Sequence, residues 1–124
     1  MRALILLLAL AACRETPLVA PDRTWQLIRL DGQPFAARAT LRIGAQDAFD
    51  GQTPCNSYGG GWTGGGGAFA AGPIRATRRA CPELAAEQSY LAALSRITAY
   101  DIADDLLTLS GPETTLVFTP APPA

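Results

Sequence analysis

The sequence predicts a mainly β fold with one helix, in which a small antiparallel sheet is strongly curved or closes into a partly open barrel. Short apolar or alternating segments separated by turn residues recur along most of the chain, and this pattern is typical of antiparallel strands. Only the stretch after Cys81 has clear helical periodicity. Strands and helices do not alternate along the chain, so a parallel α/β sheet is not expected.

The composition fits one globular domain. The chain has 124 residues, of which 48 % are apolar and 17 % are charged, and these values allow a single hydrophobic core. Ten arginines and eleven carboxylates give a net charge of -1, and the chain has no Lys and no His. Because this balance creates no strong overall field, we expect no nucleic-acid partner.

Residues 1–12 are predicted to be a signal peptide. One Arg precedes a short apolar run, and small residues lead up to Cys13. The run is about half of the roughly 20 residues that a transmembrane helix needs. Leu10-Ala11-Ala12-Cys13 resembles the bacterial lipobox, in which the cysteine is acylated and becomes the mature N-terminus. The alternative is a buried N-terminal helix with an incidental cysteine.

Acylation of Cys13, for example with palmitate, predicts a membrane anchor, because each buried CH₂ group contributes about 0.8 kcal/mol. Residues 13–23 then form a lipidated tether, since they contain two prolines and show no periodicity. We expect the protein in the bacterial cell envelope, in the outer membrane and facing the periplasm.

The folded domain is expected over residues 24–119. Its first strand covers residues 24–30 and ends at turn residues. Residues 39–43 alternate between apolar and polar side chains, as a half-buried strand does. A weaker strand carries Phe49 towards the next cysteine.

Glycine is concentrated between Gly59 and Gly67. A phosphate-binding loop also needs a Lys and a Ser or Thr at the start of a helix, and the chain has no Lys. We therefore predict a bent strand around Trp62 with a loose tip. Phe69 and Ile74 mark two further short extended segments.

One helix is predicted directly after Cys81. Pro82 suits the first helical position, Glu83 lies near the positive N-terminal end of the helix dipole, and Arg96 lies in the predicted last turn. The residues expected to face the sheet are Leu84, Tyr90, Leu91, Leu94 and Ile97, and those expected to face water are Glu87, Gln88 and Ser95.

Three more strands are predicted after the helix, around Tyr100 and Ile102, at 106–109 and at 114–119. They form a meander with two turns. Residues 120–124 are expected to be a disordered tail.

Several motifs follow one another in a fixed order between Trp25 and Phe118. After a Trp-containing strand come Cys55-Asn56-Ser57-Tyr58-Gly59-Gly60, Gly72-Pro73-Ile74-Arg75-Ala76-Thr77, Ala80-Cys81-Pro82, Glu87-Gln88-Ser89-Tyr90-Leu91-Ala92-Ala93-Leu94, Leu106-Leu107-Thr108-Leu109 and Leu116-Val117-Phe118. Together they resemble the META domain, the HslJ-like heat-shock protein family, in a bacterial lipoprotein form. The chain departs from the family pattern at Pro54, where Gly is common, and at Arg79, where an apolar residue is common.

The resemblance implies a small cracked β-barrel with a helix, in envelope lipoproteins linked to stress or drug tolerance. It implies no established catalytic residues. We therefore expect a non-enzymatic binding or stabilising module that acts as a monomer, without a cofactor, on an unidentified protein partner in the envelope. The alternatives are a barrel that carries a small apolar ligand or lipid, and an enzyme.

Cys55 and Cys81 could form a disulfide, a reactive thiol pair or two buried free thiols. Export to an oxidising compartment favours the disulfide, which would stabilise the domain by about 3 to 4 kcal/mol in the chain-entropy model. A redox role lacks the Cys-x-x-Cys spacing and a nearby His.

Other chemistry has little support in the sequence. Without His, and with two cysteines bonded, zinc has no usual ligands, so no metal site is expected. Asp104-Asp105 reads as a turn, and Asp47 and Asp50 are the remaining candidate acid and base. The aromatic residues that form either a pocket or the core are Trp25, Tyr58, Trp62, Phe69 and Phe118.

Overall fold

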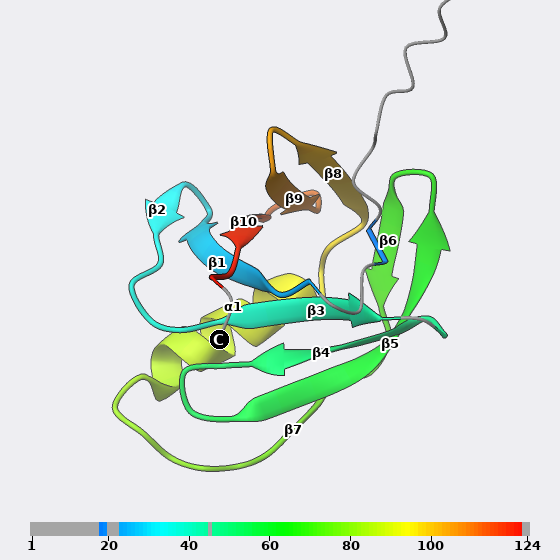
Figure 1. Ribbon diagram of the computed structural model, residues 1–124. Coiled ribbons are helices and arrows are strands. Elements are labelled where there is room, and N and C mark those ends of the chain that lie inside the picture. Colours follow the sequence, from blue (N-terminus) through cyan, green and yellow to red (C-terminus); the bar gives the residue numbers. More distant parts are fainter. Residues whose placement is uncertain (1–17, 20–22, 45, 123–124) are drawn as a thin grey trace, which may run out of the picture.

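The structure is a computed structural model that describes residues 18–19, 23–44 and 46–122. The signal peptide, Cys13 and most of the expected tether lie outside the described residues. Within them the chain forms ten strands and one helix (Figure 1). These elements are β1 Trp25–Leu30, β2 Gln33–Pro34, β3 Thr40–Gly44, β4 Ala48–Gln52, β5 Ser57–Gly65, β6 Ala68–Ala71, β7 Arg75–Ala76, α1 Leu84–Leu94, β8 Ala99–Ala103, β9 Leu106–Ser110 and β10 Thr115–Pro120.

Eight antiparallel strands form a closed barrel. Their order around the ring is β1, β3, β4, β5, β6, β8, β9 and β10, and β10 then pairs with β1. Closure places Trp25 opposite Pro120 and Leu27 opposite Phe118. The short strands β2 and β7 lie beside this ring, on β1 and β5. The predicted mainly β fold with one helix is confirmed, and the sheet is fully closed.

The pairings around the ring differ in extent. β1 and β10 share five paired positions, whereas β6 and β8 share only the pair Ala68 and Ala99. Two further backbone bonds support this short seam, from Phe69 N to Thr98 O at 3.1 Å and from Tyr100 N to Gly67 O at 2.8 Å. The β6–β8 seam therefore has fewer paired residues than the β1–β10 seam.

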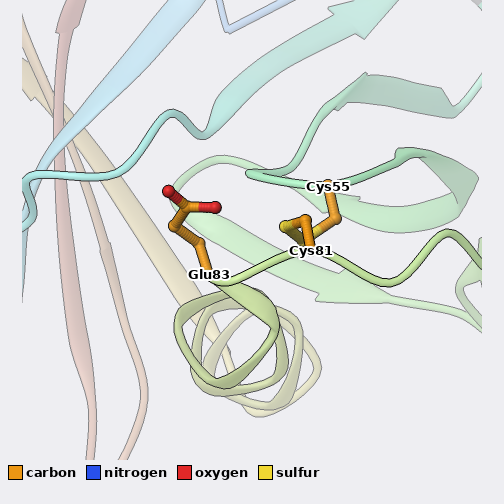
Figure 2. A group of neighbouring side chains, drawn as sticks. All are labelled: Cys55, Cys81 and Glu83. Atoms are coloured by element: carbon orange, nitrogen blue, oxygen red, sulfur yellow. A yellow bond between two sulfur atoms is a disulfide. The ribbon is translucent and has the colours of Figure 1, made fainter.

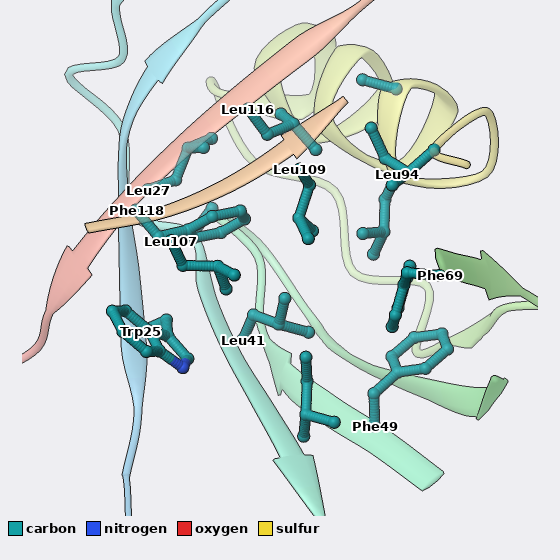
Figure 3. Close-up of a cluster of buried hydrophobic side chains, with 14 of the residues drawn as sticks. Trp25, Leu27, Leu41, Phe49, Phe69, Leu94, Leu107, Leu109, Leu116 and Phe118 are labelled. Atoms are coloured by element: carbon teal, nitrogen blue, oxygen red, sulfur yellow. The ribbon is translucent and has the colours of Figure 1, made fainter. Parts of the chain in front are cut away.

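Apolar side chains from all sides fill the barrel interior (Figure 3). Side chains alternate between the two faces of a strand, so every second residue of β9 and β10 points inwards, and the same holds for β1 as far as the irregularity after Leu27. The buried pairs on these strands are Trp25 and Leu27, Leu107 and Leu109, and Leu116 and Phe118. Each fully buried Leu or Phe contributes about 1.5 to 3 kcal/mol to folding.

The glycine-rich segment forms the long strand β5 and turns into β6. One edge of β5 pairs with β4, and the other pairs first with β7 and then with β6. At Gly60, an added Cβ would lie 2.8 Å from the carbonyl oxygen of Pro73 and 3.0 Å from the ring of Phe49. A side chain does not fit there, which agrees with glycines that let a bent strand approach its neighbours.

The helix α1 begins at Leu84, and its buried residues are Glu87, Tyr90, Ala93 and Leu94. Two expectations about its faces are wrong: Glu87 is 5 % exposed rather than directed to water, and Leu84 is 36 % exposed rather than buried. The inner face follows the spacing 87, 90 and 94, which places these side chains on one side of a helix. Arg96 follows the helix instead of lying in its last turn.

The strands β8, β9 and β10 form the predicted meander. β10 extends one residue beyond the expected domain boundary, to Pro120. Ala121 then donates its N–H to the carbonyl of Thr24 at 2.8 Å, so the chain enters and leaves the barrel side by side. Leu18, inside the expected tether, is buried against the core.

No helix among the described residues has the length and hydrophobicity that crossing a bilayer requires.

Candidate functional site

A disulfide joins Cys55, in front of β5, to Cys81, in front of α1 (Figure 2). The two Cα atoms are 5.7 Å apart, and 26 positions separate the residues in the sequence. Both cysteines are partly exposed. The predicted disulfide is confirmed, and it connects the barrel covalently to the start of the helix.

Asn56 ties the same two segments together through hydrogen bonds. Its Oδ1 accepts the backbone N–H of Arg79 at 2.6 Å, and its Nδ2 donates to the carbonyl of Arg79 at 3.0 Å. The hydroxyl of Thr77 also donates to Oδ1, at 2.9 Å. These bonds hold the chain on both sides of the cystine and do not depend on the sulfur atoms.

Glu87 brings the helix into this network. Its buried carboxylate accepts hydrogen bonds from Asn56 Nδ2, at 2.8 Å, and from the hydroxyl of Thr53. The Thr53 oxygen in turn accepts the backbone N–H of Asn56 at 2.9 Å. A buried carboxylate is stable only when hydrogen bonds or charges compensate its lost hydration. We call residues 53–57, 77–81 and 83–87 the cystine junction.

A second buried contact links the helix to the barrel beside the cystine junction. Tyr58 donates its hydroxyl proton to the carbonyl of Thr40 at 2.6 Å, and the hydroxyl of Tyr90 bonds to that of Tyr58. Since a carbonyl only accepts, Tyr90 is the donor to Tyr58. Burial raises the pKa of Tyr58 well above its ordinary value, and the neighbouring Tyr90 adds to this; burial also raises the pKa of Tyr90.

The five aromatic residues that the sequence offered as pocket or core are all buried. Trp25 is 1 % exposed and Phe118 is fully covered. Trp62 stacks on Phe69 with ring centroids 5.3 Å apart, and Tyr58 meets Tyr90 edge to face. These contacts place the aromatic side chains in the hydrophobic core and against one another, which favours a role in the core over a role in a ligand pocket.

Two surface hollows flank the segment 74–80. One has a volume of about 360 Å³ and is lined by Asp50, Ser57, Tyr58, Gly59, Arg75, Ala76 and Thr77. The other has a volume of about 480 Å³ and is lined by Asn56, Ile74, Ala76, Thr77, Arg78, Arg79, Ala80, Leu84, Glu87 and Gln88. The arginine side chains along this segment are exposed. The cystine junction thus carries a hollowed surface with positive charge at its rim.

The carboxylates that the sequence offers as acids, bases or turn residues lie in an ion pair or in turns. Asp50 forms a two-pronged contact with Arg42, at 2.7 and 3.1 Å, and this hydrogen bond raises the pKa of Arg42. Asp47 has a positive φ of 54° between β3 and β4, and Asp104 and Asp105 have φ values of 53° and 58° in the β8–β9 turn. Asp104-Asp105 is thus a turn, as predicted.

Sequence reasoning missed the buried hydrogen-bond network of Thr53, Asn56 and Glu87. One signal for Glu87 was present: it lies three residues before Tyr90 and seven before Leu94, on the face that the helix buries. No local pattern marks Thr53, because its partner Glu87 is 34 positions away.

Comparisons with known proteins agree with this architecture. A family model described as the META domain matches residues 16–123. A protein from Burkholderia xenovorans, solved by NMR, is similar with a TM-score of 0.67 and 23 % identity, over 89 % of this chain and 97 % of that one. A DUF4847 family protein from Bacteroides vulgatus is similar with a TM-score of 0.61 and 15 % identity, over 80 % of this chain and 92 % of that one. Among curated proteins no match was found.

Proposed function

Because this chain belongs to the META domain family, we propose that it is a lipid-anchored cell-envelope protein whose barrel is a non-enzymatic binding or stabilising module in envelope stress. The lipobox-like Leu10-Ala11-Ala12-Cys13 supports the anchor. Burial of the aromatic side chains favours this proposal over a carrier of apolar ligands, since Trp25 and Phe118 are covered and belong to one hydrophobic core cluster.

The Cys55–Cys81 disulfide is the observation that carries the proposal. Disulfides persist in secreted and periplasmic proteins and are rare in the bacterial cytosol. A structural disulfide therefore agrees with export by the predicted signal peptide. Acylation would then use Cys13, the third cysteine of the chain.

The outer surface of the cystine junction is the proposed binding surface. Arg75, Arg78 and Arg79 are exposed there, beside the two hollows. Within the part of the chain that the structure describes, the only salt bridge is between Arg42 and Asp50, so these three arginines remain available to a partner with acidic side chains. The monomeric barrel would present this surface at the membrane on its lipid tether.

The anchor is tested by replacing Cys13. In bacteria fed with labelled palmitate, the wild type should carry the label and sediment with membranes, whereas Cys13→Ala should do neither. Thr16→Ala, three residues further on, is the control and should behave as the wild type. Palmitate labelling that persists in Cys13→Ala would overturn the anchor.

The binding surface is tested by crosslinking in intact cells under envelope stress. A crosslinked adduct of the wild type should be lost in the variant Arg78→Gln/Arg79→Gln and retained in Arg29→Gln, which changes an exposed arginine on β1. Equal adducts in both variants would place the partner elsewhere on the barrel.

A further inference from the structure

Three metal-ligating groups meet at the cystine junction. The Sγ atoms of Cys55 and Cys81 and a carboxylate oxygen of Glu83 all lie within 4.8 Å of one another. Figure 2 shows Glu83 on the chain that leads from Cys81 into the helix. Thiolate sulfur and carboxylate oxygen are both common ligands of Zn²⁺. While the sulfur atoms are bonded to each other, however, they are not thiolates and cannot serve as ligands.

Hydrogen bonds that involve no sulfur also hold the two cysteine-bearing segments together. Asn56, next to Cys55, holds both the N–H and the carbonyl of Arg79, two positions before Cys81. Glu87 holds Asn56 from the helix side at 2.8 Å. Because these hydrogen bonds involve no sulfur, the distance of 5.7 Å between the two cysteine Cα atoms is set by the surrounding structure as well as by the disulfide.

The backbone of Glu83 is held in place, whereas its side chain is available for binding. The N–H of Glu87 donates to its carbonyl at 3.1 Å, and the N–H of Leu84 donates to the carbonyl of Cys81 at 3.2 Å, which fixes the turn between the two candidate ligands. Glu83 is exposed, and its carboxylate forms no salt bridge with a described residue. Its side chain is therefore free to turn towards the sulfur atoms.

We propose that reduction of the Cys55–Cys81 bond converts the cystine junction into a site for a thiophilic divalent cation such as Zn²⁺, with two thiolates and the Glu83 carboxylate as ligands. Water would complete a tetrahedral shell, since both cysteines are partly exposed. This proposal does not depend on the lipid anchor or on the partner surface.

A dithiol reductant transfers two electrons and two protons to the cystine, which becomes two thiols, and the reductant becomes a disulfide. Metal binding then displaces the two thiol protons into the solvent, so affinity rises with pH. Thiol–disulfide exchange with a second disulfide, which takes up the two electrons and becomes a dithiol, would re-form the Cys55–Cys81 bond and release the ion.

The test uses Co²⁺ as a coloured substitute for Zn²⁺. The full chain is reduced with a phosphine, which becomes a phosphine oxide with oxygen from water, and is titrated with Co²⁺ without oxygen. We expect one Co²⁺ per reduced chain, a thiolate-to-cobalt charge-transfer band that Zn²⁺ abolishes, and neither band nor binding in the oxidised protein. A reduced protein without this band would overturn the proposal.

Variants identify the ligands. Cys81→Ser should remove the charge-transfer band, and Glu83→Gln, which keeps the shape of the side chain, should weaken Co²⁺ binding roughly tenfold or more. Glu113→Gln, at an exposed turn, is the matched control and should bind as the wild type. Equal affinity of Glu83→Gln and Glu113→Gln would remove Glu83 from the site. Loss of the native circular dichroism on reduction would also overturn the proposal, because the ligands would no longer be held together.

Discussion

At the scale of single residues, Glu87 shows how a charged side chain is kept inside this small domain. It is 5 % exposed, and its two carboxylate oxygens are bonded to Thr53 and Asn56. Those two residues are themselves buried, so each polar group in the cluster depends on the others. Removing Glu87 takes a buried charged acceptor away from both residues, which costs more than the loss of one surface hydrogen bond.

Glu87→Ala should therefore lower the free energy of unfolding by about 2 to 3 kcal/mol, since Asn56 Nδ2 and the Thr53 hydroxyl lose a charged acceptor. Urea unfolding at neutral pH measures the change. Gln88→Ala alters the adjacent exposed position and should change the free energy of unfolding by less than about 0.5 kcal/mol. Similar effects in the two variants would contradict the role of Glu87.

Tyr58 and Tyr90 should make the free energy of unfolding fall at alkaline pH. Burial raises the pKa of both phenols in the folded state, while an unfolded tyrosine ionises near pH 10. The folded state therefore keeps protons that the unfolded state loses, and stability should be retained below about pH 10 and fall above it by about 1.4 kcal/mol per pH unit for each tyrosine. Urea unfolding between pH 9 and 11 (roughly one unit on either side of that pKa) measures the slope.

Tyr90→Phe should reduce this slope, because one of the two buried phenols is removed. Tyr100→Phe, at a partly exposed position of β8, serves as the control and should retain the slope of the wild type. If Tyr90→Phe also retains the full slope, the alkaline loss of stability does not arise from this pair.

At the scale of elements, the close contact between β4 and β3 depends on a missing side chain. A Cβ at Gly51 would lie 2.0 Å from the carbonyl oxygen of Thr40 and 2.8 Å from the ring of Tyr58. That carbonyl also accepts the hydroxyl of Tyr58. A side chain at position 51 would therefore push β4 away from β3. It would also displace Tyr58 from the carbonyl of Thr40.

Gly51→Ala is expected to destabilise the protein by about 1 to 3 kcal/mol through this overlap. Gly61→Ala, on the neighbouring strand β5, is the matched control, because its nearest neighbour would be the carbonyl oxygen of Asp47 at 3.6 Å, an ordinary contact. Thermal unfolding followed by circular dichroism compares the two. Equal melting temperatures would show that β4 can move away from β3 at little cost.

The elements also show what the sequence could predict. Strands such as β3 and β9 follow from apolar alternation between turn residues, which is a local signal. Tyr90 and Leu94 of α1, and Ile97 just after it, are buried as expected, and only Leu84 and Glu87 were misplaced, because hydrophobicity alone assigns an apolar residue to the core and a charged residue to water. The true face is set by Thr53 and Asn56, which lie more than 30 positions before Glu87, and a single sequence does not reveal such partners.

At the scale of the whole molecule, closure of the barrel was equally hidden from local patterns. It depends on β1 pairing with β10 at opposite ends of the domain, with Trp25 opposite Pro120. The expected curved or partly open sheet contained the same strands but lacked this long-range pairing. Closure removes exposed strand edges, and it makes the β6–β8 seam, with one paired position, the expected place of local opening.

Amide hydrogen exchange should detect that opening. The N–H groups of Phe69 and Tyr100, which bridge the seam, should exchange faster than those of β1 and β10, because a short seam opens without global unfolding. Exchange followed by NMR in the oxidised protein provides the comparison. Equal protection along both seams would show that the barrel opens only as a unit.

The side-by-side positions of Thr24 and Ala121 allow the chain to be cut and rejoined. A short linker between these two points, with new ends at Gly66 in the β5–β6 turn, would give a circular permutant with the same ring of strands. Exposed loop tips tolerate such new ends best. The permuted barrel would have its ends at the β5–β6 turn, so a tether attached there would hold the protein by that turn instead of by the start of β1.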